Sequence, residues 1–229
     1  MLILFFESMD QQNAIRNFTL LLATVAGFCD TLTFVTSQEF SAHVTGNFIV
    51  LAYDIIKGAD ASSWMKLASF PVFIIAVITG GWIIARTANK CSILLAEGMI
   101  LAITGLIMLV LKFQHFNSVW IEYSIIMPVV FAMGLQNAFG KLFSKETYGP
   151  TTMMTGNVTQ AALDLWEIIK TKFNNDLILQ SFKNQSYTLG GFLIGCLLGA
   201  LAGELVGLSA VLLPGIALII YPKKLNTVN

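Results

Sequence analysis

Two copies of one tripeptide, Thr-Gly-Asn, carry the side chains best suited to binding a ligand. They lie in "HVTGNFIV" and "MMTGNVTQ", 110 residues apart, and each precedes a short apolar segment. Thr and Asn commonly cap helix N-termini, and Gly allows close backbone approach. We therefore expect each copy to begin a short helix whose first N–H groups bind an anion or dipole, although capping and close packing are the alternative. The residues are Thr45, Gly46, Asn47, Thr155, Gly156 and Asn157.

A second matched pair of segments places polar side chains in apolar surroundings. "GFCD" ends at Asp30, whereas "GLQN" contains Gln136 and ends at Asn137. An ionised carboxylate inside a membrane helix costs at least about 2.5 kcal/mol, so Asp30 should face a cavity or a partner. Asn137 cannot titrate, so only the first segment offers a proton or cation site. The alternative is that Asp30 is protonated or caps a nearby helix.

The remaining polar residues have less specific interpretations. His43 stands alone in sequence and is interpreted as an incidental loop residue that could titrate near the site. Four acidic residues are interpreted as solvated near the membrane interface, the first two beside Lys57 and Lys170: Asp54, Asp164, Glu97 and Glu204.

Several chemistries are missing from the sequence. It contains no P-loop, no H-E-x-x-H and no G-x-S-x-G motif. Its three cysteines show neither a pairing pattern nor metal-ligand spacing. We therefore expect no catalytic residues, no metal site and no cofactor. Zero net charge and the lack of a basic patch argue against a nucleic-acid partner.

Composition indicates that lipid is the solvent of this chain. Hydrophobic residues make up 56% of it and charged residues 11%, less than half the share of about 25% in soluble domains. Two apolar segments, Asn47–Ile56 and Asn157–Ile169, would cover roughly 15 and 20 Å as helices, short of the ~30 Å hydrocarbon core. Six longer blocks could span a bilayer: about 16–37, 66–86, 92–112, 119–141, 187–206 and 208–222.

The order of these blocks predicts an all-α integral membrane protein with one membrane domain, 1–229, made of two related halves. The halves are about 1–113 and 114–229, each with a long, a short and two long helices. If the short helices are re-entrant, each half crosses three times and the second half is inverted, as in many transporters. If both short helices span, the halves are parallel. Segment length favours the inverted model.

Basic residues predict the orientation in a bacterial inner membrane. With both termini in the cytoplasm, the inverted model places 10 Lys and Arg inside and 3 outside, and the parallel model places 9 and 4. Both satisfy the positive-inside rule. The sequence therefore predicts cytoplasmic termini without separating the two models.

Glycines recur every fourth residue in the fifth long block. Small residues at this spacing let membrane helices approach closely. The stripe predicts packing against another helix, either within the chain or across a homodimer. It consists of Gly191, Gly195, Gly199, Gly203 and Gly207.

The motif pairs "GFCD…HVTGN" and "GLQNAF…MMTGN" resemble those of the YoaK family of small bacterial membrane proteins. The resemblance covers about residues 15–210. It implies an integral inner-membrane protein with six or more helices, and it implies no function.

These observations favour a transporter or channel for an unidentified small solute or ion. The matched spacing predicts that Asp30, Asn47, Asn137 and Asn157 converge on one site between the two short helices. One alternative is a membrane scaffold in which the polar residues serve only packing, and another is a lipid-modifying enzyme. A water-accessible cavity at Asp30 would favour transport, whereas a closed, dry centre would favour the scaffold.

Overall fold

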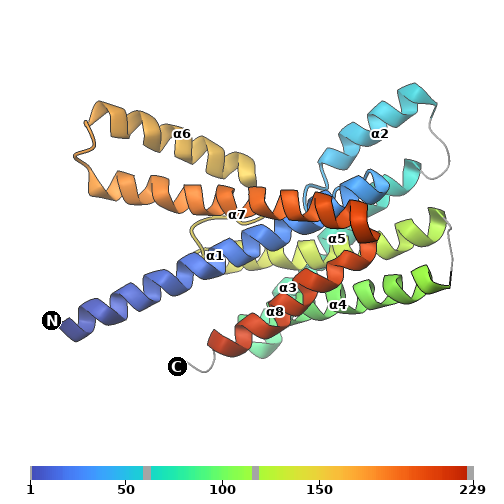
Figure 1. Cartoon of the computed structure of the whole chain (residues 1–229), viewed down its shortest axis with the longest axis horizontal. Helices are drawn as coiled ribbons and strands as arrows, with labels where there is room; N and C mark the ends of the chain where they lie inside the picture. The colour runs from blue at the N-terminus through green and yellow to red at the C-terminus, as the bar shows by residue number, and fades with distance from the viewer. Residues whose placement is uncertain (1, 59–62, 115–118, 226–229) are drawn as a thin grey trace.

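The computed structural model is all-helical in the parts of the chain that it describes, residues 2–58, 63–114 and 119–225 (Figure 1). Two 3₁₀ helices, η1 (Ser63–Ala68) and η2 (Gly207–Val211), lead into α3 and α8. The α-helices are α1 (Leu2–Ser37), α2 (Gly46–Lys57), α3 (Ser69–Thr87), α4 (Cys91–Phe113), α5 (Val119–Leu142), α6 (Met154–Lys170), α7 (Asp176–Val206) and α8 (Leu212–Leu225).

Five stretches within the described residues are long and apolar enough to cross a membrane: Gln11–Ser37, Ser63–Thr87, Cys91–Lys112, Tyr123–Leu142 and Asp176–Tyr221. The last stretch contains α7 and most of α8. The chain reverses its direction between these two helices at Gly207, where φ is +73° (Figure 1). Large apolar side chains such as Ile78, Trp82 and Leu197 remain exposed on these helices, as expected of surfaces that face lipid. The chain is therefore an integral membrane protein.

The helices match the predicted blocks with two extensions. The first predicted block starts at about residue 16, but α1 runs back to Leu2. The fifth starts at about residue 187, but α7 begins at Asp176, where Asn175 caps its N-terminus. Both extra segments contain many polar residues, which is why hydropathy alone misses them.

Three pairs of long helices and two short helices define the architecture of the described residues. Helix α1 packs along α7, α3 packs along α5, and α4 packs against both α5 and α8. In Figure 1 the long helices lie roughly along the long axis, while α2 and α6 begin near the middle and extend toward opposite ends. Helix α2 contacts η1, and α6 contacts α7. The main apolar core lies between α1, α4 and α5.

Four glycines of the stripe bring α7 against α1 of the same chain. A Cβ on Gly195 or Gly199 would collide with the carbonyl oxygen of Thr24 or Phe28. The stripe thus has a partner without a second copy of the protein. Gly191 and Gly203 also face α1, with 3.1 Å from an added Cβ to the nearest atom, but Gly207 has no atom within 4 Å and does not belong to the packed stripe. The prediction that Gly207 packs against another helix was therefore wrong. Its positive φ instead allows the turn into η2.

The two halves make matching contacts. Gly27 of α1 lies against the carbonyl oxygen of Phe192 in α7. Gly134 of α5, 107 residues later, lies against the carbonyl oxygen of Phe73 in α3, with 3.1 Å from an added Cβ. The first long helix of each half therefore packs through a glycine on the third helix of the other half.

Candidate functional site

Asp30, near the end of α1, holds the loop that leads into α2. Its Oδ1 accepts hydrogen bonds from the backbone N–H groups of Ala42 (2.7 Å) and His43 (3.2 Å). Its Oδ2 lies 2.6 Å from His43 Nδ1. The carboxylate is only 4% exposed, so its partners are protein groups. The hydrogen bond to Asp30 raises the pKa of His43, because it favours the imidazolium. The interpretation of His43 as incidental was wrong.

Asn137 occupies the matching place at the end of α5. Its Nδ2 donates to Thr152 Oγ1 at 2.9 Å. Thr152 lies 110 residues after Ala42, which is the same spacing as between the two Thr-Gly-Asn copies. Each Gly-led motif therefore ends in a polar side chain that binds the loop before a short helix.

The two Asn residues of the tripeptides bind the same loops from the other side. Asn47 Oδ1 accepts from the Phe40 N–H (2.7 Å), and Asn47 Nδ2 donates to the Phe40 oxygen (2.8 Å) and to Ser69 Oγ (2.9 Å). Asn157 Nδ2 donates to the Pro150 oxygen at 2.7 Å. Pro150 is the counterpart of Phe40, seven residues before its Asn, but proline has no N–H to donate.

These bonds correct the predicted role of the tripeptides at the helix ends. Thr45 precedes α2 without making a side-chain cap, and Met153 precedes α6, so Thr155 and Gly156 lie inside the first turn of α6. The first N–H groups of α2 are not free. The Gly46 N–H, for example, donates to the His43 oxygen at 2.7 Å.

The glycines and threonines of the two copies differ in their surroundings. An added Cβ on Gly46 would lie 2.9 Å from the Phe40 ring, whereas Gly156 has nothing within 4 Å. Thr45 and Thr155 are both exposed. Neither threonine therefore points into a protein-lined site.

Gln136 links the second loop to α1. Its Nε2 donates to the Leu22 oxygen (2.7 Å) and to Thr151 Oγ1 (2.9 Å), while its buried Oε1 has no hydrogen-bond partner. Asp30 and Asn47 thus bind residues 40–43, and Gln136, Asn137 and Asn157 bind residues 150–152. Among the described residues no hydrogen bond joins these two groups, so the predicted site residues form two separate clusters.

Glu97 is the functional candidate that sequence reasoning misplaced. It is 0% exposed, and neither carboxylate oxygen has a hydrogen-bond partner. Ile93, Leu94 and Leu101 lie four or fewer residues away on the same face of α4, and all belong to the main apolar core. That spacing was the available signal, because a glutamate among core positions cannot reach water.

Two other acidic residues are also corrected. Asp54 pairs with Lys66, whose Nζ lies 2.9 Å from Asp54 Oδ2. Lys66 is itself 4% exposed and donates to the Tyr123 hydroxyl at 3.3 Å, so it is not an accessible outside charge. Asp164 is buried and accepts from Gln160 (2.8 Å) and Ser181 (2.6 Å). Gln160 lies on α6 and Ser181 on α7, so Asp164 is hydrogen-bonded inside the protein rather than solvated as predicted.

Glu39 and Ser41, in the loop before α2, are buried residues that the sequence did not single out. The carboxylate oxygens of Glu39 and the hydroxyl of Ser41 have no hydrogen-bond partner. Burial raises the pKa of Glu39 to about 7, although the positive charge of Lys66 and the nearby Ser69 hydroxyl, which makes no well-aligned hydrogen bond to Glu39, oppose the shift. Glu204, by contrast, is exposed, as expected.

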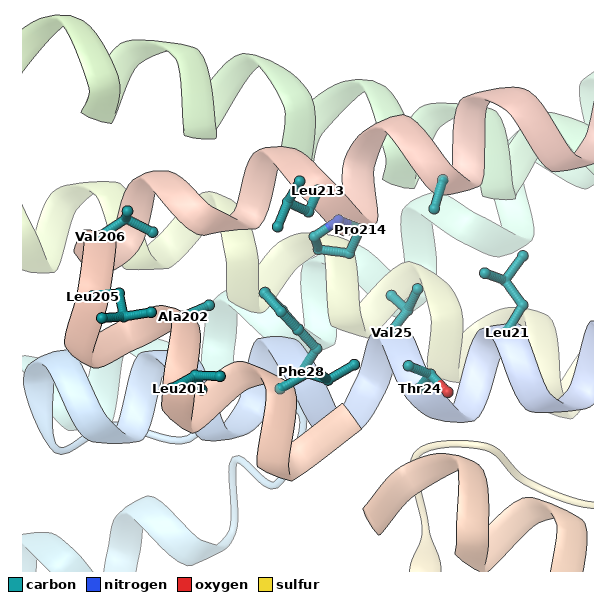
Figure 2. Close-up of a pocket in the computed structure, with 12 residues that line it drawn as sticks. Leu21, Thr24, Val25, Phe28, Leu201, Ala202, Leu205, Val206, Leu213 and Pro214 are labelled. Atoms are coloured by element: carbon teal, nitrogen blue, oxygen red, sulfur yellow. The ribbon is translucent and has the colours of Figure 1, made fainter. Parts of the chain in front are cut away.

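An apolar cavity of about 480 Å³ lies between α1, α7 and α8. Figure 2 shows Leu201 and Leu205 of α7 and Pro214 of α8 around Val25 and Phe28 of α1. None of the predicted site residues lines this cavity. It exists because α8 packs closely on α4 but makes few contacts with α1, whereas α4, its counterpart in the first half, packs extensively on α5.

Comparison with known proteins identifies a family for almost the whole chain. A family model described as "Protein of unknown function (DUF1275)" matches residues 18–221. The match supports an uncharacterised membrane-protein family, and the narrower YoaK identification remains a resemblance. The comparisons with curated proteins and with solved structures gave no match.

Proposed function

We propose that this chain, which belongs to the DUF1275 family, is a transporter for a small solute or ion. The observation that carries the proposal is Glu97, a carboxyl group buried in the apolar core without a partner. Burying such a group without a hydrogen-bond partner lowers the stability of the fold, so its presence indicates a function. Ionisable residues inside membrane helices commonly mark ion or proton pathways. We assign the chain no catalytic residue and no cofactor.

The proposed architecture is an inverted repeat with six crossings, made by α1, α3, α4, α5, α7 and α8. By their rise, α2 and α6 are about 18 and 26 Å long, shorter than the ~30 Å core. Their start near the middle and their opposite directions fit re-entrant half-helices, as in many transporters (Figure 1). The matched glycine contacts of α1 with α7 and of α5 with α3 support the same plan.

The orientation follows from the same plan. Helix α1 begins and α8 ends at one end of the molecule (Figure 1). The excess of basic residues that the positive-inside rule assigns to that end supports an orientation with both termini in the cytoplasm of a bacterial inner membrane.

Asp30 fits a closed state of this transporter. Its carboxylate is enclosed and bound to the loop before α2. Opening a path to the centre requires this loop to move, and Ser41, beside that contact, would then meet water.

The second candidate function is a membrane scaffold. It is favoured by the closed centre at Asp30, which is only 4% exposed, and by the hydrogen bonds that join Asp30, Asn47, Asn137 and Asn157 to loop residues of their own chain. In that case the polar centre would stay closed at all times.

Cysteine accessibility separates the two functions without knowledge of the solute. In a variant with the three native cysteines replaced by serine, Ser41→Cys should react with a water-soluble maleimide in membranes, because a transporter samples open states. Val129→Cys, equally buried in the apolar core, is the matched control and should not react. Lys57→Cys, at an exposed position, reports that the reagent works. If Lys57→Cys reacts while Ser41→Cys stays unreactive from both sides, the protein is a scaffold.

A further inference from the structure

Glu97 has surroundings that suit only one kind of ligand. Among the described residues it makes no ion pair; Cys29 of α1 lies near it, and Asp30 of α1 lies near Cys29. Asp30 is already paired with His43. A metal ion would need several ligand oxygens, and an organic cation would need space. The apolar cavity between α1, α7 and α8 does not include Glu97 in its lining. A proton needs neither further ligands nor a cavity.

We infer that Glu97 binds a proton while the centre is closed and releases it when the helices around it separate. The neutral acid avoids the cost of burying an unpaired charge in the apolar core. Release requires water to reach α4, because only a solvated carboxylate is stable as an anion. The occupancy of the site is thereby linked to the conformation of the protein.

The packing of α4 indicates which helices move. Gly98, next to Glu97, lies against the Gly215 oxygen of α8, 3.0 Å from an added Cβ, and Gly215 lies equally close to the Gly98 oxygen (2.9 Å). This reciprocal contact joins α4 and α8 into one unit. The apolar cavity separates α8 from α1, so it provides the room for that unit to shift (Figure 2).

The second half has no equivalent acid. The reciprocal contact of Gly98 with Gly215 pairs Glu97 with Pro214, a residue that lines the apolar cavity. We therefore expect one buried acid of this kind in the apolar core between α1, α4 and α5, distinct from Glu39 in the loop before α2. The coupling between protonation of Glu97 and the conformation of the protein rests on the proposed transporter function. Protonation of Glu97 by itself does not rest on that function.

Infrared spectroscopy of the full-length protein in lipid vesicles tests the inference directly. At neutral pH, Glu97→Gln should remove one C=O stretching band of a protonated carboxylic acid from the spectrum. Glu39→Gln is the matched comparison. In the wild type, the carboxylic acid band of Glu39 should disappear as the pH rises through about 7. Glu204→Gln, at an exposed position, should remove only carboxylate bands. Removal of carboxylate bands by Glu97→Gln would overturn the inference.

Two further measurements cover the other outcomes. If Glu97→Gln does not fold, the wild-type spectrum decides, because the inference requires a carboxylic acid band that persists above the titration of Glu39. On transfer to D₂O, the Glu97 band should shift slowly, at the rate at which the centre opens. A band that is present but never exchanges would leave the protonation intact and overturn both the coupling and the transporter. A missing band together with a reactive Ser41→Cys would overturn the inference alone.

Discussion

At the scale of single residues, the buried polar groups fall into two classes. Asp30 and Asn47 have hydrogen bonds on every side-chain oxygen, and they fix the loop before α2. Glu97 and Ser41 have buried oxygens without partners. Because an unpartnered buried polar group typically costs about 1–3 kcal/mol, the second class needs a function more than the first does.

The pair of Asp30 and His43 should make stability depend on pH. The folded protein binds the His43 proton more tightly than the unfolded chain, since Asp30 raises the pKa of His43. The resulting stabilisation is complete below the unfolded value of about 6.5 and is lost as pH rises through the raised folded value. The melting temperature of the wild type, measured in detergent, should therefore fall relative to that of His43→Gln over this range. Glu39 is present in both proteins and cancels. Parallel curves would contradict the pair.

The two Asn residues should differ in their importance. Asn47→Ala removes three hydrogen bonds and leaves both backbone groups of Phe40 without that partner, so we expect a loss of about 1–3 kcal/mol. Asn157→Ala removes one bond to a backbone oxygen and should cost less. Thr45→Ala, at an exposed position with no capping bond, should stay within about 0.5 kcal/mol. Denaturation in detergent measures all three, and an equal loss for both Asn variants would show that the loops are held differently.

At the scale of helices, close backbone packing holds the two halves together. Gly195 and Gly199 place α7 directly on the backbone of α1, and Gly134 does the same for α5 and α3. In lipid there is no hydrophobic driving force between helices, so such contacts and their van der Waals energy carry much of the association. The stripe is thus structural, and the proposed function does not depend on it.

Alanine at two glycines of α7 should have different effects on stability. In Gly199→Ala the new Cβ meets the carbonyl oxygen and Cα of Phe28, which are backbone atoms that cannot rotate away, so we expect a loss of about 1–3 kcal/mol. Gly190 has nothing within 4 Å, and Gly190→Ala should be neutral or stabilise the helix by up to about 1 kcal/mol. Thermal denaturation of the two variants is the measurement. Equal melting temperatures would mean that α1 and α7 do not touch as described.

At the scale of the whole molecule, the two halves share packing but not chemistry. The first half contains Asp30 and Glu97, where the second has Asn137 and Pro214. The second half therefore binds its loop with a neutral amide, and its buried acid, Asp164, is hydrogen-bonded to Gln160 and Ser181. A protein that handles one proton per cycle needs an unpartnered buried acid in only one half.

The inverted plan predicts that the C-terminal ends of α2 and α6 lie on opposite sides of the membrane. In a background without native cysteines, Lys57→Cys should react with an impermeant thiol reagent added to intact cells. Lys170→Cys should react only after permeabilisation. Both positions are exposed, whereas Lys66 is buried against Asp54 and cannot serve as a reporter. Labelling of both variants from the same side would rule out the inversion and favour parallel halves.

The amino-acid sequence by itself determined the membrane helices and the matched positions of the two halves. Hydropathy and helix length are local properties, since each residue adds about 1.5 Å whatever its neighbours, so the blocks could be located to within a few residues except at the polar ends of α1 and α7. The offsets of the repeated motifs also predicted that Asp30 corresponds to Asn137 and Asn47 to Asn157, and each pair binds matching positions in the two loops.

Only the tertiary structure decided which of the polar groups have partners. Asp30 meets His43 because the loop before α2 folds back on α1, and Lys66 meets Asp54 because η1 packs against α2. Glu97 has no partner because the face of α4 that carries it turns toward the core formed with α1 and α5. The sequence determines the charge of a side chain and its position along a helix. The solvation of that side chain depends on the segments that surround it in the folded protein.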